Sequence, residues 1–133
     1  MITVEGKFLR QLNKYGYFAR VVMEIKNEEF SSVSTEKVIG WQNEQVEFNW
    51  IKGAEIGANY ALEKIKTKKY NIRITKILGT DSDTNPTIVG TATIFGIWEA
   101  LKVKISDDII EDLINLTLKS WTKSYNNLPT YEI

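Results

Sequence analysis

The sequence predicts a single soluble α+β domain. Several short segments alternate between hydrophobic and polar residues, as half-buried strands do, and longer segments carry hydrophobic residues at three- and four-residue spacing, as helices do. The chain has 133 residues, of which 43% are hydrophobic and 26% are charged. These values match one hydrophobic core of ordinary size, which at this length needs neither a disulfide nor a structural metal.

The first two predicted strands are expected to pair as an antiparallel hairpin. From Tyr15 onward, hydrophobic residues alternate with polar ones such as Arg20, which is the clearest strand pattern in the chain. Residues 2–10 alternate in the same way, so the turn between the strands is expected around Leu12 to Lys14. A third, weaker strand is predicted from Phe30 to Thr35. The alternating hydrophobic positions of the first two strands are Ile2, Val4, Phe8, Tyr15, Tyr17, Ala19, Val21, Met23 and Ile25.

A helix is predicted over residues 44–66, where hydrophobic residues recur at helical spacing. Its start is open, because Val46, Phe48 and Trp50 also alternate and a strand there remains an alternative. Asn43 is a candidate N-cap. Gly53 and Gly57 lower helix propensity, and their spacing indicates a face of the helix that lies close against the sheet.

The second half of the chain predicts one more strand and two helices. Tyr70, Ile72 and Ile74 alternate, and a polar loop at residues 79–85 follows this strand. Asn85 before Pro86 is typical of an N-cap and a first helical residue. The helix from Pro86 to Lys102 is hydrophobic on all sides, which predicts burial. A final helix is expected from Asp107 to about Ser124, with acidic residues near its start and lysines near its end, matching the helix dipole.

The residue types missing from the sequence exclude several kinds of catalysis. The chain has no Cys and no His, which cysteine nucleophiles, serine–histidine–aspartate triads and histidine acid–base catalysis require. No GxxxxGK(S/T) motif occurs, so no GTP binding is predicted. Asp81 and Asp83 fit Asx-rich turn chemistry better than a calcium loop. The sequence therefore predicts a protein that is not an enzyme and that needs no cofactor or metal.

The net charge and the hydropathy of the sequence limit the classes of partner that the protein is expected to bind. Seventeen basic and seventeen acidic residues give a formal net charge of zero, so only a local basic patch would attract nucleic acid. The N-terminus lacks a basic region followed by a hydrophobic stretch, and no hydrophobic run approaches the roughly eighteen residues that would span a bilayer. A cytoplasmic location without membrane contact is expected.

Four segments resemble domain IV of translation elongation factor G, in the order that family has them. They are Val4–Gln11 (VEGKFLRQ), Gly16 with the following strand, Ala54–Leu62 (AEIGANYAL) and Ile97–Leu101 (IWEAL). The resemblance covers about Thr3 to Lys102. It divides the chain into residues 1–103, which form the domain IV-like α+β domain, and residues 104–133, a C-terminal helix and tail packed on the same domain.

The resemblance implies a fold and a partner. The family has a mixed β-sheet with helices packed on one face, a ribosomal-protein domain 2-like fold with a left-handed β-α-β crossover, and the extra C-terminal helix here would be an addition to it. In the family, the tip of this domain enters the decoding site of the small ribosomal subunit and contacts messenger and transfer RNA. We therefore expect a stand-alone, non-catalytic binding module that contacts the ribosome or RNA.

The two tip loops of the family match residues 12–17 and 79–85, with clear departures. The family's first loop is rich in glycine, whereas only Gly16 remains here. The second loop is shorter than the family's, has no His, and aligns an acidic residue only at Asp83. Cations beside aromatic residues such as Phe18 are what stacking of single-stranded RNA requires. The candidate binding residues are Lys7, Arg10, Lys14, Tyr15, Tyr17, Arg20, Asp81, Asp83 and Asn85.

Two alternatives remain open at this point. The basic segment from Lys64 to Lys76 could meet RNA phosphates, but a solvated helix end and an edge strand explain it better. The altered tip loops also fit a protein-interaction or regulatory domain that kept the scaffold and lost RNA binding. An exposed Trp41 or Tyr131 would favour this protein-binding alternative.

Overall fold

The structure, a computed structural model, describes residues 1–36, 44–122 and 128–133. Its sheet has four strands in the order β1-β2-β4-β3. β1 (Ile2–Leu12), β2 (Tyr15–Asn27) and β4 (Tyr70–Leu78) are antiparallel to their neighbours, while β3 (Ser32–Thr35) runs parallel to β4. The expected mixed sheet in an α+β fold is therefore confirmed.

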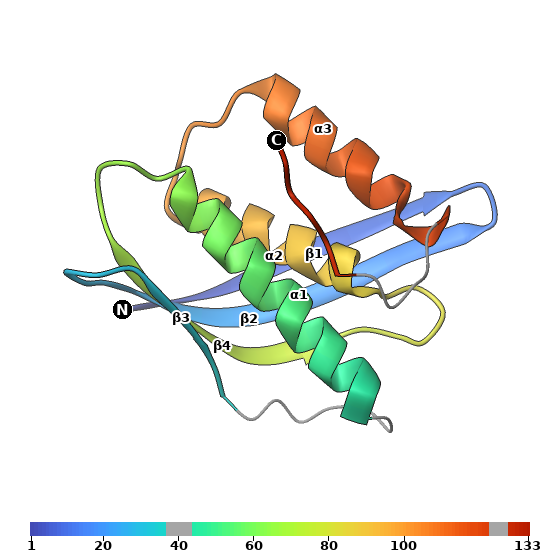
Figure 1. Ribbon diagram of the computed structural model, residues 1–133, viewed down its shortest axis with the longest axis horizontal. Coiled ribbons are helices and arrows are strands. Elements are labelled where there is room, and N and C mark those ends of the chain that lie inside the picture. Colours follow the sequence, from blue (N-terminus) through green and yellow to red (C-terminus); the bar gives the residue numbers. More distant parts are fainter. Residues whose placement is uncertain (37–43, 123–127) are drawn as a thin grey trace.

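The hairpin of β1 and β2 closes through the two-residue turn Asn13–Lys14. Asn13 has a φ of 57°, in the left-handed region that asparagine tolerates better than most residues. Its register pairs Leu12 with Tyr15 and continues to Ile2 opposite Ile25. This long, regular hairpin extends well beyond the other strands at its turn, as Figure 1 shows.

All helices lie on one face of the sheet (Figure 1). They are α1 (Glu44–Glu63), α2 (Pro86–Ala100) and α3 (Asp107–Leu118), with the short 3-10 helix η1 (Ser120–Thr122) after α3. α2 packs against β1 and β2, α1 packs against α2 and the β3/β4 side, and α3 packs against α2. α2 is accordingly the most buried helix, as its hydrophobic sequence predicted.

The connection from β3 through α1 to β4 is a parallel β-α-β unit. Figure 1 places the helices in front of the sheet. For a viewer on that side, looking along the common direction of β3 and β4, β4 lies to the left of β3. The crossover is thus left-handed, against the general preference for right-handed units and as the resemblance implied.

Several predicted boundaries shift. The segment from Val46 to Trp50 is helical, so the strand alternative there was wrong. β3 begins at Ser32 rather than Phe30. α1 ends at Glu63, α2 at Ala100 and α3 at Leu118, each earlier than predicted. Asn43, Trp41 and Ser124 lie outside the described residues.

The glycines of α1 lie close against α2 and not against the sheet, which corrects the prediction. A Cβ at Gly53 would overlap the main chain of Pro86, and one at Gly57 would overlap the main chain of Gly90. The two helices therefore cross at backbone contact, where any larger residue would separate them.

The start of α2 is fixed by its predicted N-cap. The side chain of Asn85 accepts a hydrogen bond from the Ile88 N–H at 2.9 Å, and Pro86 occupies the first turn. Asn85 also donates to the Ser120 hydroxyl at 2.9 Å. Both polar ends of this buried amide are therefore used inside the protein.

The C-terminal segments are tied to the rest of the fold. The Tyr17 hydroxyl donates to the main-chain oxygen of Leu118 at 2.7 Å. In the tail, Pro129 is buried, and the Tyr131 hydroxyl lies 3.2 Å from both the Thr91 hydroxyl and the Thr87 carbonyl oxygen on α2. Among the residues that the structure describes, no helix combines the length and the apolar composition needed to cross a membrane.

Candidate functional site

The two loops expected to form a tip lie side by side. The Phe18 N–H donates to the main-chain oxygen of Asp83 at 2.8 Å, and the Thr84 hydroxyl donates to the Phe18 carbonyl at 2.5 Å. The loop at residues 79–85 thus docks on the start of β2, immediately behind the turn Asn13–Lys14. The fold therefore brings the two predicted loops into one surface at one end of the molecule.

The loop at residues 79–85 is held in shape by Thr80 and Thr84. The Thr80 N–H donates to the Thr84 hydroxyl at 2.8 Å, and the Thr84 N–H donates to the Thr80 carbonyl at 3.1 Å. The Asp83 N–H donates to the Thr80 hydroxyl at 3.1 Å. A loop with this many internal bonds presents the Asp83 side chain in a defined place.

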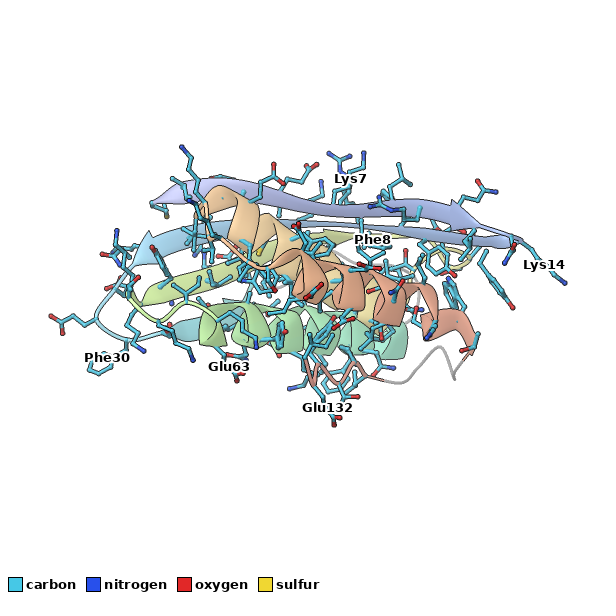
Figure 2. The ribbon with its side chains drawn as sticks, turned by 90° about the horizontal axis from the view of Figure 1, so that it is seen from above. Lys7, Phe8, Lys14, Phe30, Glu63 and Glu132 are labelled. Atoms are coloured by element: carbon cyan, nitrogen blue, oxygen red, sulfur yellow. The ribbon has the colours of Figure 1, made fainter. Side chains whose placement is uncertain are left out.

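The sheet face opposite the helices carries the other candidate residues, and we call it the open face. Figure 2 shows Lys7 pointing away from the helices and Phe8, its neighbour on β1, pointing into them. Strand alternation places Phe18 and Arg20 on the same face as Lys7. The open face comprises Thr3, Glu5, Lys7, Leu9 and Gln11 of β1, Gly16, Phe18, Arg20, Val22, Glu24 and Lys26 of β2, and Asn71, Arg73, Thr75, Lys76 and Leu78 of β4.

Rows of directly opposed residues cross the open face. The row nearest the turn holds Gln11 opposite Gly16, and the row after it holds Leu9 opposite Phe18. The next row holds Lys7, Arg20 and Leu78. Leu9 is 54% exposed, and Phe18 and Leu78 are half-buried. The turn end of the open face therefore combines an aromatic ring and aliphatic side chains with cations.

Ion pairs neutralise part of the open face. Arg20 binds both carboxylate oxygens of Glu5, at 2.9 and 2.7 Å, and this bond lowers the pKa of Glu5. Farther from the turn, Arg73 contacts Glu24 at 2.5 Å and Glu36 at 2.9 Å. Lys7 and Lys76 have no ion-pair partner among the described residues. Lys7 and Lys76 are thus the cations of the open face that no described acidic side chain neutralises.

The predicted binding residues fall into three environments. Lys7 and Arg20 lie on the open face, and Lys14 and Tyr15 lie at the hairpin end, where Figure 2 shows Lys14 at the extremity of the molecule. Asp81 is exposed and Asp83 is half-buried in the adjoining loop. Arg10 lies on the other face of β1, 5.3 Å above the Phe8 ring.

Two of the predicted residues are inaccessible. Tyr17 is 1% exposed and Asn85 is 2% exposed. Burial raises the pKa of Tyr17, and its hydroxyl is used by the Leu118 carbonyl. Both side chains shape the tip from within and present no surface to a ligand.

Leu9 and Leu78 were not among the predicted site residues, whereas Phe18 was expected beside the cations without being included among the candidate binding residues. It shares its strand parity with Arg20 and not with the buried Tyr17, so alternation alone assigns it to the outward face. The contribution of Leu78 depends on the pairing of β2 with β4, a contact between distant segments that no local pattern gives.

The basic segment from Lys64 to Lys76 does not form one patch. The Lys64 ammonium donates to the main-chain oxygen of Ile133 at 2.8 Å, and Arg73 is paired with acids. Lys69 lies beside the end of β2, since its carbonyl accepts from Glu28. That end is opposite the hairpin turn, so only Lys76 joins the cations around Phe18.

Two of the sequence-based expectations concern metal binding and an exposed aromatic patch. Within residues 1–36, 44–122 and 128–133, no group of three or more acidic side chains is placed to hold a metal ion. Tyr131 is half-buried, with its hydroxyl between helices, so it gives no exposed aromatic patch.

Comparison with known proteins gives a likeness of fold. No protein-family model and no curated protein sequence matches the chain. A crystal structure of a protein from Thermus thermophilus matches with a TM-score of 0.57 and 14% identity, over 73% of this chain and 15% of that one. Two structures of Streptococcus pneumoniae phosphomevalonate kinase cover 95% and 96% of this chain and 44% and 43% of theirs. Their TM-scores are 0.38 and 0.36 at 9% and 10% identity, too low to indicate a shared fold.

The chain spans less than half of each of these solved proteins. At 14% identity, the Thermus protein shares the α+β architecture with residues that cover about three quarters of this chain. The comparison with the Thermus protein therefore supports the α+β fold of this chain.

Proposed function

We propose that the chain is a non-catalytic binding module related to elongation factor G domain IV, and that it binds RNA of the translation machinery. The observation that carries the proposal is the docking of the loop at residues 79–85 onto the hairpin, through the Phe18 N–H and the Asp83 carbonyl. The loops that match the family's tip thereby form one surface.

The chemistry around this surface supports RNA over other ligands. Lys7, Lys14 and Lys76 are exposed cations without ion-pair partners among the described residues. Phe18 lies between them on the open face, and aromatic rings beside cations bind unpaired bases and phosphates together. Each cation that neutralises a phosphate of a single strand contributes about 0.7 to the slope of log affinity against log salt.

The proposal is tested by co-sedimentation of the purified chain with small ribosomal subunits across a salt series. Three phosphate contacts predict a slope of about −2. A double variant in which both Lys7 and Lys14 are replaced by Glu should no longer co-sediment. The matched control is Lys104→Glu, an exposed lysine in the connection after α2, at the end of that helix away from the tip loops. Absence of binding by the unmodified chain at low salt would overturn the proposal.

One observation favours a second candidate, a protein-interaction domain. Leu9, Phe18 and Leu78 form apolar surface across three strands, and the chain has no net charge. A protein partner seated there would be insensitive to salt, unlike RNA. Binding to ribosomal subunits that persists unchanged in high salt, or that is lost on Leu9→Ser but not on Lys14→Glu, would favour this candidate.

A further inference from the structure

We propose that the turn end of the open face takes an unpaired guanine base, which stacks on Phe18 and donates hydrogen bonds to the Asp83 carboxylate. The inference rests on the RNA-binding function proposed above and names the base that this surface selects.

The main chain of Phe18 is fixed by the adjoining loop. Its N–H and its carbonyl are both bonded to the loop at residues 79–85, at 2.8 and 2.5 Å. Leu9 lies directly opposite on β1, where cross-strand neighbours on one face are close enough for their side chains to interact. An aromatic side chain on the exposed face of a sheet is a common platform for single-stranded bases, because every base has a π-face.

The Asp83 carboxylate lies on the same face of the sheet as Phe18, over Gly16, which is the neighbouring residue of β2 on that face. Gly16 shares the strand parity of Phe18, so a Cβ at Gly16 would project onto the open face. That Cβ would lie 2.5 Å from Asp83 Oδ1 and 2.7 Å from Oδ2. The carboxylate therefore occupies the space that the missing side chain of Gly16 leaves, at the position next to Phe18 on this face of β2.

Both oxygens of this carboxylate are free to accept. Among the described residues, the hydrogen bonds of Asp83 use only its main-chain N–H and carbonyl. No basic side chain in the described part of the chain pairs with it. A half-buried carboxylate with both acceptors unused, on the same face as an aromatic residue, matches a ligand that brings two donors.

Guanine is the base that brings two adjacent donors. Its N1–H and N2–H groups lie side by side on the Watson–Crick edge and fit the two oxygens of one carboxylate. Uracil offers one donor there, and cytosine and adenine offer a single amino group. Because charged hydrogen bonds in a paired geometry are the stronger kind, Asp83 should select guanine.

The surrounding charges direct the rest of the strand. Asp83 and Asp81 repel phosphates, so the backbone must pass on the other side of Phe18. Lys7 and Arg20 form the next row in that direction, and Lys76 lies one row beyond. The strand is thereby oriented with its base toward the loop and its phosphates toward these cations.

The test is fluorescence anisotropy of labelled seven-nucleotide RNAs with the complete chain at low salt. The probes are a uridine tract and the same tract with a central guanosine, inosine, adenosine or cytidine. One bidentate pair predicts that guanosine tightens binding by about tenfold. Inosine lacks the N2 amino group, so it should recover only part of that gain.

Variants assign the effect to the two residues. Asp83→Asn should remove the guanosine preference and leave affinity for the uridine tract equal or higher. Asp81→Asn is the matched control, an equal charge change in the same loop, and it should keep the preference. Phe18→Leu keeps an apolar side chain without a π-face, and it should weaken binding of every probe. Thermal unfolding of each variant verifies that it is folded.

The possible outcomes distinguish the guanine site from RNA binding as such. If the probes bind equally, or if Asp81→Asn removes the preference as Asp83→Asn does, the guanine site is overturned while RNA binding stands. If none of the probes binds and the ribosomal subunits do not co-sediment, both fall. Retention of full affinity by Phe18→Leu would also overturn the stacking role.

Discussion

The indole N–H of Trp121 donates a 2.8 Å hydrogen bond to the main-chain carbonyl of Gly16, across 105 residues of sequence. Gly16 lies in β2 just after the hairpin turn, two residues before Phe18. The short helix η1 is therefore attached to the strand that carries the proposed stacking residue. The segment beyond the family resemblance thus has a structural role at the tip.

Replacing Trp121 with Phe should loosen the hairpin end while leaving the fold intact. The variant keeps an aromatic ring but leaves the Gly16 carbonyl without this donor, at a cost of about 1 kcal/mol. Urea unfolding measures the loss, and amide hydrogen exchange should accelerate at the turn end of β1 and β2. Thr122→Ala is the control, because that hydroxyl bonds only the Lys119 carbonyl nearby. Unchanged exchange in the hairpin would contradict the assigned role.

Gly57→Ala should destabilise the protein, although alanine favours helices by up to about 1 kcal/mol over glycine. The new Cβ would overlap the Gly90 main chain, and overpacking of this kind costs about 1–3 kcal/mol. Denaturant unfolding gives the free energy. Asn59→Ala, at an exposed position of α1, provides the matched control and should be neutral or stabilising. A more stable Gly57→Ala variant would show that the two helices can separate without cost.

Gly53 and Gly57 also show which contacts can be predicted from the sequence alone and which cannot. Their spacing correctly indicated a close approach, but whether α1 approaches the sheet or another helix depends on the position of α2. Likewise, the alternation at Val46 to Trp50 fitted both a strand and a helix, and the structure gives a helix. Periodicity describes one element at a time, whereas the partner of each face is set by contacts between distant segments.

The candidate site was predictable to a similar extent. Charged residues on strands, such as Lys7 and Arg20, were placed correctly by alternation. Asn85 was recognised as an N-cap, yet it was also proposed for binding. Its second bond, to Ser120, buries it, and only the packing of the C-terminal segment creates that bond. The Asp83 carboxylate over Gly16 joins two loops that are distant in sequence.

Alkaline pH should destabilise the protein through Tyr131. Burial of its hydroxyl between helices raises the pKa of Tyr131 well above the ordinary value of 10.0, although the residue as a whole is only half-buried. Tyr131 ionises more easily in the unfolded chain than in the folded protein. The contribution of its buried, neutral hydroxyl to the free energy of unfolding is therefore complete below pH 10. It is lost as the pH rises from there toward the pKa of Tyr131 in the folded protein.

Tyr131→Phe tests this directly, since phenylalanine has no ionisable group. Its free energy of unfolding should fall less between pH 9 and pH 11 than that of the unmodified chain, and at neutral pH it should lose about 1 kcal/mol for the hydroxyl. Tyr15→Phe is the control, because Tyr15 is 43% exposed. Equal alkaline slopes for the Tyr131→Phe variant and the unmodified chain would refute the account.

Glu5→Gln should strengthen the proposed RNA binding by releasing Arg20. In the present structure the guanidinium is held by both Glu5 oxygens, at 2.9 and 2.7 Å, and is partly withdrawn from a phosphate. Removing the carboxylate's charge adds one available cation to the row of Lys7, so the slope of log affinity against log salt should steepen by about 0.7. The measurement is anisotropy of a labelled uridine tract across a salt series. Glu63→Gln is the matched control, since Figure 2 shows Glu63 on the helix side, away from Lys7. If both substitutions change the slope equally, the effect is general charge, and Arg20 has no particular place in the interface.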